Sequence, residues 1–195
     1  MINGAGKNLG IALLIAKETA LRVGEIIRLQ WTDIDPEKNL ILMNSPEKRS
    51  NPGAYKVSHE LISRTMSLPK RHEKLFPTTV NSITARLRNT RKLLAKKLEN
   101  PRLRKITFHT LRHWKATMLY HKTRDIFYVK DFLRHRDIRN TMIYINVERM
   151  LFQNSDNGEF HVKVAKTLNE ACDLIKVGFE YVTDMDEVKL FRKRK

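Results

Sequence analysis

The sequence predicts a mainly α-helical fold with one small antiparallel β-sheet (α+β), followed by a small C-terminal β-α-β-β appendage. Three observations predict it. Apolar residues recur at helical spacing along much of the chain, two short strand-like runs flank a loop rich in Pro and Gly, and alternating runs return after residue 159. We therefore divide the chain into a main domain over residues 1–152 and, over residues 153–195, a linker, the appendage and a basic tail.

The composition narrows the class of protein. A chain of 195 residues can bury a sizeable core. It carries 38 Lys and Arg against 21 Asp and Glu, a formal net charge of +17, which favours nucleic acid as a partner. A ribosomal-type or merely soluble basic protein is the alternative on charge alone. The single cysteine excludes an internal disulfide, and no signal peptide or membrane-spanning run is present. We expect a cytoplasmic protein without a membrane partner.

The N-terminal half is expected to contain two helical pieces, a hairpin and a further helix. Arg22 lies between the two helical pieces, with Glu25 three residues later. The two residues either form an ordinary ion pair, or Arg22 binds phosphate and Glu25 orients it. The predicted elements are helices over residues 10–29, broken by a turn, and 58–66, and strands over residues 40–43 and 54–57.

A strongly basic helix is predicted from residue 80 to about residue 98. Its apolar residues fall at helical spacing, and its other positions are crowded with Lys and Arg. A basic helix of this kind is either a solvated face or a surface that lies along DNA phosphates, and we favour the phosphates. The candidate DNA-binding residues on it are Arg86, Arg88, Arg91 and Lys92.

The stretch from His109 to Tyr144 carries the residues suited to phosphate chemistry. His109 and Arg112 lie three residues apart on a predicted helix with Thr107 as its N-cap. A second helix over residues 125–133 leads to His135, and a third over residues 141–150 carries Tyr144. Arginine binds phosphate oxygens, histidine transfers protons near neutral pH, and a tyrosine hydroxyl can act as a nucleophile.

The C-terminal appendage follows a polar linker over residues 153–159. Its expected strands and helix cover residues 160–164, 168–177, 179–182 and 187–191, with the helix second in order. The terminal residues 192–195 form a basic tail.

Four motifs in this order resemble the signature of the tyrosine recombinases, the integrase and Xer group. They are Thr19-Ala-Leu-Arg22-Val-Gly-Glu25-Ile, His109-Thr-Leu-Arg112-His113, Leu133-Arg-His135 and Thr141-Met-Ile-Tyr144. The resemblance covers roughly residues 10 to 150 and implies the catalytic fold of that family. It also implies strand cleavage and rejoining through a 3′-phosphotyrosyl link, without metal, ATP or other cofactor.

The resemblance assigns a role to each matching residue. Arg22, Arg112 and His135 stabilise charge on the scissile phosphate, with Glu25 orienting Arg22. Tyr144 is the nucleophile, and His109 acts as general base or orients the attack. In the family the general acid is a lysine of this hairpin. Lys48 fits that position best here, and Arg49 and Lys56 are the alternative candidates.

Two positions depart from the family pattern. Arg134 stands where glycine usually precedes the histidine, and either crowds the site or contacts another DNA phosphate. Asn146 stands where family members often carry histidine.

Three other activities use some of the same residues. A type IB topoisomerase shares the arginines and the tyrosine, and a non-catalytic DNA-binding module would leave the site unused. His109 and His113 have the spacing of a zinc protease, but Thr110 replaces the glutamate which that motif needs.

The implied partner is double-stranded DNA, bound by a homotetramer that is monomeric when free. Only 21 residues precede Arg22, whereas family members usually carry a helical domain there that clamps the far side of DNA. The chain is either a catalytic fragment or a naturally minimal enzyme, and a missing clamp predicts weak, salt-sensitive binding. Viral integration, plasmid resolution and chromosome unlinking all stay open, so the protein is placed at a nucleoid or in an infected host cell.

Overall fold

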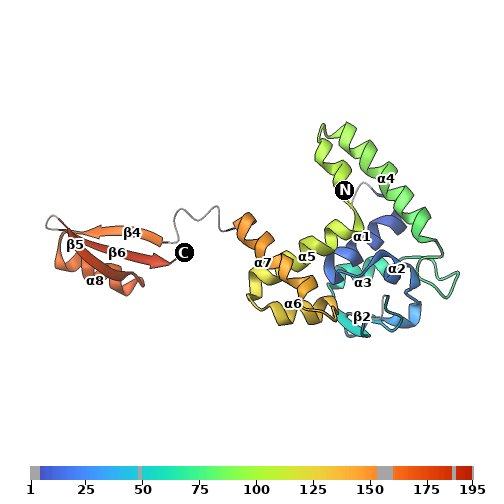
Figure 1. Ribbon diagram of the computed structural model, residues 1–195, viewed down its shortest axis with the longest axis horizontal. Coiled ribbons are helices and arrows are strands. Elements are labelled where there is room, and N and C mark those ends of the chain that lie inside the picture. The colour runs from blue at the N-terminus through green and yellow to red at the C-terminus, as the bar shows by residue number, and fades with distance from the viewer. Residues whose placement is uncertain (1–4, 48–49, 153–159, 186–187, 195) are drawn as a thin grey trace. The chain divides into compact units, whose positions relative to one another are not determined.

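The computed structural model of the chain describes residues 5–47, 50–152, 160–185 and 188–194. It confirms the predicted fold class, because helices predominate and the strands form small antiparallel sheets (Figure 1). The chain divides into two compact units, Met1–Glu148 and Arg149–Lys195. No helix within the described ranges is both long enough and apolar enough to cross a bilayer.

The first unit is mainly helical. Its α-helices are α1 (Lys7–Thr19), α2 (Val23–Arg28), α3 (His59–Met66), α4 (Val80–Lys97), α5 (Phe108–Thr123), α6 (Ile126–Leu133) and α7 (Arg139–Phe152), the last of which runs past the unit boundary. Its strands and 3-10 turns are β1 (Ile34–Asp35), β2 (Leu40–Met43), β3 (Gly53–Lys56), η2 (Trp31–Asp33) and η3 (Pro101–Lys105).

Helix α1 is the centre of the first unit. Most of its residues from Leu9 to Thr19 are buried, and it packs against α2, α3, α4 and α5. Its sequence has a small, apolar or weakly polar residue at nearly every position of this stretch, as a helix surrounded by other elements requires. The helix begins at Lys7, three residues before the predicted start.

The small sheet packs its inner face on this core. Strand β2 pairs antiparallel with β1 on one side and with β3 on the other, and Ile41 lies opposite Tyr55. Along β2, Ile41 and Met43 are buried and alternate with half-buried residues, the pattern of a sheet with one face on the core. The predicted hairpin is present, and β1 adds an edge strand on the other side of β2.

Three helices of the first unit end at a residue in the left-handed conformation. Ala20, Arg124 and Arg134 close α1, α5 and α6 with φ angles of 56°, 54° and 56°. At the other end of α5, Thr107 is the N-cap, as predicted, and accepts a hydrogen bond from the N–H of Thr110. These helix ends matter because the carbonyl groups closing α1 and α6 line the site described below.

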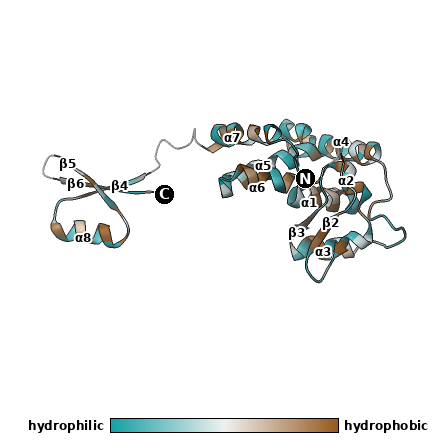
Figure 2. Ribbon diagram, turned by 60° about the horizontal axis from the view of Figure 1, so that its bottom comes forward, coloured by the Kyte–Doolittle hydropathy of each residue, from teal (hydrophilic) through white to brown (hydrophobic). Residues whose placement is uncertain are grey.

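The second unit is a three-stranded sheet with one helix. Its elements are β4 (Phe160–Ala165), α8 (Leu168–Lys176), β5 (Glu180–Met185) and β6 (Val188–Arg194), and the strand order is β4-β6-β5. Its small core contains Ala171 from α8 and Phe191 from β6. Apolar and polar segments both occur along α8 in Figure 2, as an amphipathic helix requires. The predicted order of strands and helix is observed.

Candidate active site

Arg22 lies in the turn between α1 and α2, at the N-terminus of α2. Its backbone N–H donates to Glu25 Oε2 at 2.9 Å, and its Nη1 donates to Glu25 Oε1 at 3.3 Å. The same Nη1 donates to the Ser50 hydroxyl at 3.0 Å, so the β2–β3 loop also holds the guanidinium. The Arg22 side chain is 21% exposed and thus stays accessible to an anion.

Glu25 is a fully buried carboxylate behind Arg22. It accepts a hydrogen bond from the N–H of Glu47 at 3.2 Å, and its Oε1 lies 2.8 Å from Arg134 Nη2. Burial raises the pKa of Glu25, but the N–H of Arg22 and the charge of Arg134 act against burial and hold the pKa below its ordinary value. Glu25 is therefore ionised at neutral pH and can orient Arg22.

Arg134, for which the sequence leaves open crowding of the site or contact with another DNA phosphate, is a buried residue. Its side chain is 4% exposed, and besides the ion pair with Glu25 its Nη1 donates to the carbonyl of Asn51 at 3.0 Å. The guanidinium also lies 5.7 Å from the centre of the Tyr55 ring. Nε and Nη2 make no hydrogen bond of good geometry within the described chain, so the contact with Glu25 is chiefly electrostatic. Arg134 is therefore buried against Glu25 and the β2–β3 loop in the free chain.

Arg112 is buried in α5, where it joins the ends of two other helices. Its Nη1 donates to the carbonyl of Ala20 at the end of α1, and its Nη2 donates to the carbonyl of Leu133 at the end of α6 at 2.8 Å. Carbonyl groups at helix C-termini carry partial negative charge and suit a cation. Burial and then the charge of Arg22 lower the pKa of Arg112 to about 10. Arg112 is therefore still positively charged at neutral pH.

His135 follows α6 and lies beside Arg112. Its Nε2 is 3.1 Å from Arg112 Nη2, and its Nδ1 is 3.0 Å from Thr141 Oγ1. Because a guanidinium can only donate, Nε2 is the acceptor and the ring proton is on Nδ1, facing Thr141. Burial and then the charges of Arg112 and Arg22 lower the pKa of His135 to about 4. The ring is consequently neutral at pH 7.

Tyr144 lies on α7 and is 2% exposed. Burial raises the pKa of Tyr144, and the charges of Arg112 and Arg22 oppose that rise without cancelling it. The Tyr144 ring packs against Ala20 and Leu133, whose carbonyl groups accept hydrogen bonds from Arg112. The structure brings Arg22, Arg112, His135 and Tyr144 into one site. The Tyr144 ring packs in a small cluster with Ala20, Ala116, Val129 and Leu133.

His113 is the histidine that contacts the nucleophile candidate. Its Nδ1 lies 3.1 Å from the Tyr144 hydroxyl. His109 is exposed one turn earlier on α5, and its ring stands edge-on to His113 with centroids 4.2 Å apart. Sequence analysis did not select His113 as a site residue. The sequence does place His113 on the same face of the helix as His109. Spacing along α5 does not tell, however, which of the two histidines reaches a side chain on α7.

Two of the three general-acid candidates, Lys48 and Arg49, lie outside the described residues. The third, Lys56, is exposed on β3 opposite Leu40. Ser50 and Asn51 come next in the chain after Arg49, and they contact Arg22 and Arg134. The described end of the β2–β3 loop therefore lies at the site.

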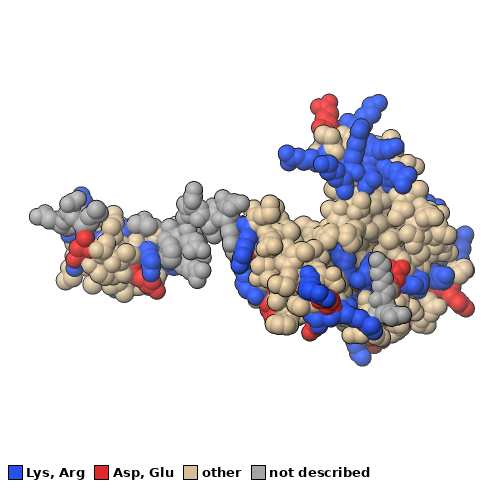
Figure 3. Space-filling view, viewed as in Figure 1, with Lys and Arg blue, Asp and Glu red and all other residues tan. Residues whose placement is uncertain are grey.

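Helix α4 presents most of its basic residues to solvent. Arg86, Arg88 and Lys92 are exposed, whereas Arg91 is half-buried and its Nη1 donates to the carbonyl of Ile106 at 2.8 Å. Lys and Arg side chains gather over α4 and the following turn η3 in Figure 3. The first three residues thus contribute to a positive surface, while Arg91 ties α4 to the segment that leads into α5.

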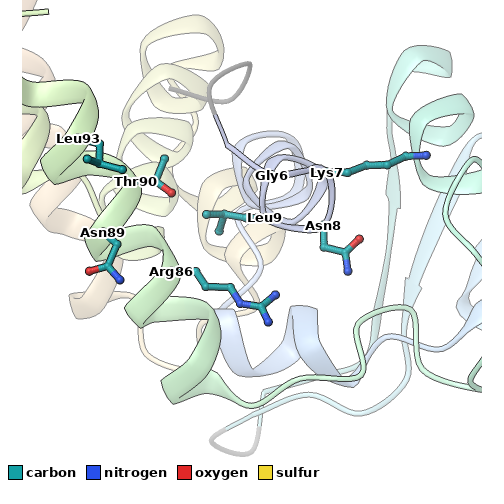
Figure 4. A pocket seen from close by; sticks show the side chains of 8 residues that line it. All are labelled: Gly6, Lys7, Asn8, Leu9, Arg86, Asn89, Thr90 and Leu93. Carbon is teal, nitrogen blue, oxygen red and sulfur yellow. The ribbon is translucent and has the colours of Figure 1, made fainter. Parts of the chain in front are cut away.

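A groove of about 440 Å³ lies between the N-terminal end of α1 and helix α4 (Figure 4). Arg22, Arg112, His135 and Tyr144 do not line it. A phosphodiester within a duplex approaches an open surface and needs no enclosed pocket, so the groove is not assigned to phosphate chemistry. The residues that line it are Gly6, Lys7, Asn8, Leu9, Arg86, Asn89, Thr90 and Leu93.

Comparison with known proteins places these features in a family. The sequence profile of the phage integrase family matches residues 5–150. No curated protein sequence shows a significant match to the chain.

Several solved structures share the fold. The crystal structure of XerA recombinase matches with a TM-score of 0.62 at 21% identity, covering 80% of this chain and 62% of that one. The Tn1549 transposon integrase in complex with transposon right end DNA matches with a TM-score of 0.60 at 17% identity, covering 74% of this chain and 58% of that one. The XerH site-specific recombinase bound to palindromic difH substrate matches with a TM-score of 0.56 at 21% identity, covering 76% and 45%. The chain spans less than two thirds of the length of each.

Proposed function

Since the chain belongs to the phage integrase family, we propose that it is a site-specific tyrosine recombinase that cleaves and rejoins DNA through a 3′-phosphotyrosyl intermediate. The observation that carries the proposal is the meeting of Arg22, Arg112 and His135 with Tyr144 in one site. A nucleophile beside two guanidinium groups suits attack on a phosphodiester, because fixed positive charge stabilises the oxygens as the fifth bond to phosphorus forms.

The two arginines and His135 would bind the non-bridging oxygens of the scissile phosphate. Arg112 is held by helix-end carbonyls and Arg22 by Glu25, so neither guanidinium has to reorganise much when DNA binds. In the free chain the Nε2 of His135 accepts from Arg112. A bound phosphate would favour the imidazolium form, whose Nε2–H can donate to a phosphate oxygen.

Tyr144 would attack the phosphorus, and the 5′ oxygen would leave as a hydroxyl after taking a proton. For that proton we propose Lys48, on the family resemblance, since it belongs to the loop whose next described residues contact Arg22 and Arg134. The phosphotyrosyl bond keeps the energy of the broken phosphodiester, so rejoining would need no ATP. The arginines would supply the charge that a metal ion supplies in other enzymes of phosphate transfer.

Double-stranded DNA is the proposed substrate, and a tetramer on DNA the proposed working assembly. The basic surface on α4 supports a DNA partner. So do the solved relatives, because the Tn1549 integrase and XerH structures are complexes with DNA. The cytoplasm, at a nucleoid or in an infected host cell, is the proposed location.

A covalent-trapping experiment tests the proposal. The chain is incubated with a pool of nicked duplexes of random sequence, in which a short cleaved fragment diffuses away and prevents rejoining. We expect a protein–DNA adduct on denaturing gels for the wild type and none for Tyr144→Phe, which lacks the attacking hydroxyl. Sequencing the trapped DNA would identify the preferred site.

Tyr128→Phe is the matched control, because Tyr128 is exposed on α6 and outside the site. It should form the adduct at the wild-type rate. An adduct that persists in Tyr144→Phe would overturn the assignment of the nucleophile. Absence of any adduct from the wild type, while gel shifts still show DNA binding, would favour a non-catalytic DNA-binding protein.

A further inference from the structure

The position of Tyr144 raises the question of where its proton goes. A phenol hydroxyl must lose its proton as it attacks phosphorus, and the Tyr144 side chain is almost completely shielded from water. Within the described residues, the hydrogen-bond partner of its hydroxyl is His113, with Nδ1 at 3.1 Å. This distance falls within the range of about 2.6–3.2 Å over which a general base takes a proton.

We propose that His113 is the catalytic base that accepts the proton of Tyr144 during strand cleavage and returns it during rejoining. The inference rests on the proposed function, because it concerns the same site and reaction. It differs from the family resemblance, which points to His109 for this role.

The surroundings of His113 fit an acceptor. His113 faces His109 on its own helix, Arg112 beside it, His135 from the segment after α6, and Tyr144 on α7. Burial and then the charges of His109 and Arg112 lower the pKa of His113. The ring is therefore neutral at pH 7, and one nitrogen has a free electron pair. With the proton on Nε2, Nδ1 can accept from the hydroxyl.

His109 is placed to assist and not to act directly. Its ring contacts the edge of His113, and it lies on the exposed first turn of α5. The His113 ring therefore has a second, more exposed imidazole in contact with it. The positive charge of Arg112 also favours the phenolate over the phenol at Tyr144.

The proposed step balances as follows. The O–H proton of Tyr144 moves to His113 Nδ1 while the tyrosine oxygen bonds to phosphorus. The bond from phosphorus to the 5′ oxygen breaks, and this oxygen takes a proton from the general acid of the proposed reaction. In rejoining, the 5′ hydroxyl attacks, the tyrosine oxygen leaves, and the imidazolium of His113 returns the proton to it. No electron donor or acceptor is required.

The test is a single-turnover cleavage assay on a nicked duplex recovered from the trapping experiment, comparing wild type, His113→Ala and His109→Ala. We expect His113→Ala to cleave about 10²- to 10⁴-fold more slowly at neutral pH, the usual contribution of a positioned base. Added imidazole should restore part of the rate. The residual rate should rise with pH as Tyr144 ionises unaided, and His109→Ala should lose less than His113→Ala.

His113→Asn separates a base from a structural contact, because an amide can keep a hydrogen bond to Tyr144 but cannot take its proton. The proposal predicts a slow His113→Asn enzyme with a wild-type unfolding midpoint. Wild-type cleavage by His113→Asn, or a slow His113→Ala that responds to neither imidazole nor pH, would overturn it. If the wild type itself forms no adduct, the proposed function fails, a result distinct from failure of His113 alone.

Discussion

Glu25 illustrates how single residues hold the site together. One buried carboxylate contacts the arginine of the α1–α2 turn, the backbone of the β2–β3 loop and the arginine that ends α6. These segments are distant in sequence, so the direction of Arg22 depends on all of them. The backbone N–H of Arg22 and then the positive charge of Arg134 offset the cost of burying Glu25.

Arg134→Gly restores the residue that the family usually has at this position and removes the strain of φ 56°. Two effects oppose each other. Relief of the left-handed conformation stabilises by about 1 kcal/mol, whereas removing one of the two arginine partners of a buried carboxylate costs up to about 3–5 kcal/mol. We expect a net loss of roughly 2–4 kcal/mol in the free energy of unfolding, measured by urea denaturation, together with slower cleavage.

Glu99→Gly provides the control for Arg134→Gly. Glu99 has φ 48° at an exposed position, so only the relief of strain should be seen there. A stabilised Arg134→Gly would show that the ion pair with Glu25 contributes less than the backbone strain.

At the scale of elements, α4 and α5 contribute different kinds of residue. Helix α5 carries Arg112 and His113 into the site, while α4 carries exposed basic residues on a surface apart from it. Arg88, Lys92 and Lys96 follow one another at i, i+4 and i+8, and all are exposed, so they form a row along one side of α4. Such a row matches the regular spacing of backbone phosphates better than it matches base edges.

Replacing Arg88 and Lys92 with Gln should weaken DNA binding in a salt-dependent way. If each residue contacts one phosphate, the slope of log affinity against log salt should become less negative by about 1.8, roughly 0.9 per lost contact. The measurement is filter binding of a duplex over a series of KCl concentrations, with specific and random sequences affected alike.

The double variant Lys166→Gln and Lys176→Gln is the control, because both residues are exposed in the second unit. Residues 149–195 contain nine Lys and Arg and eight Asp and Glu, so most of the net charge of +17 belongs to the first unit. An equal change in slope from both double variants would argue against a DNA surface on α4.

At the scale of the whole molecule, the fold was largely predictable and the site only partly so. The helical periodicity around Leu133 and the cap at Thr107 place α5 and α6 correctly, because these signals are local. The burial of Arg134 was not predictable, since a charged residue in place of glycine gives no sign of a carboxylate from α2 nearby. The contact between His113 and Tyr144 likewise depends on how α7 packs on α5.

The stability of the whole molecule should fall on mild acidification. The folded chain keeps His135 neutral, with its pKa lowered to about 4 from an ordinary 6.5. The unfolded chain binds a proton there as the pH falls below 6.5, and the folded chain does not until near pH 4. The stabilisation is therefore complete above 6.5 and is lost progressively as the pH approaches 4. Burial also lowers the pKa of His113, which adds to the trend.

Urea midpoints measured between neutral pH and the folded pKa of His135 would show this fall. His135→Gln cannot titrate, so its midpoint should depend less on pH over the same window. Parallel curves for the wild type and His135→Gln would contradict the prediction.

The order of the site along the chain has a consequence for synthesis of the protein. Arg22 leaves the ribosome first, Arg112 much later and Tyr144 last, and Tyr144 becomes enclosed only when α7 packs beside Ala20, Val129 and Leu133. A nascent chain therefore gains its proposed phosphate ligands before its proposed nucleophile. The proposed capacity to cleave a DNA strand would therefore arise late in the folding of the first unit.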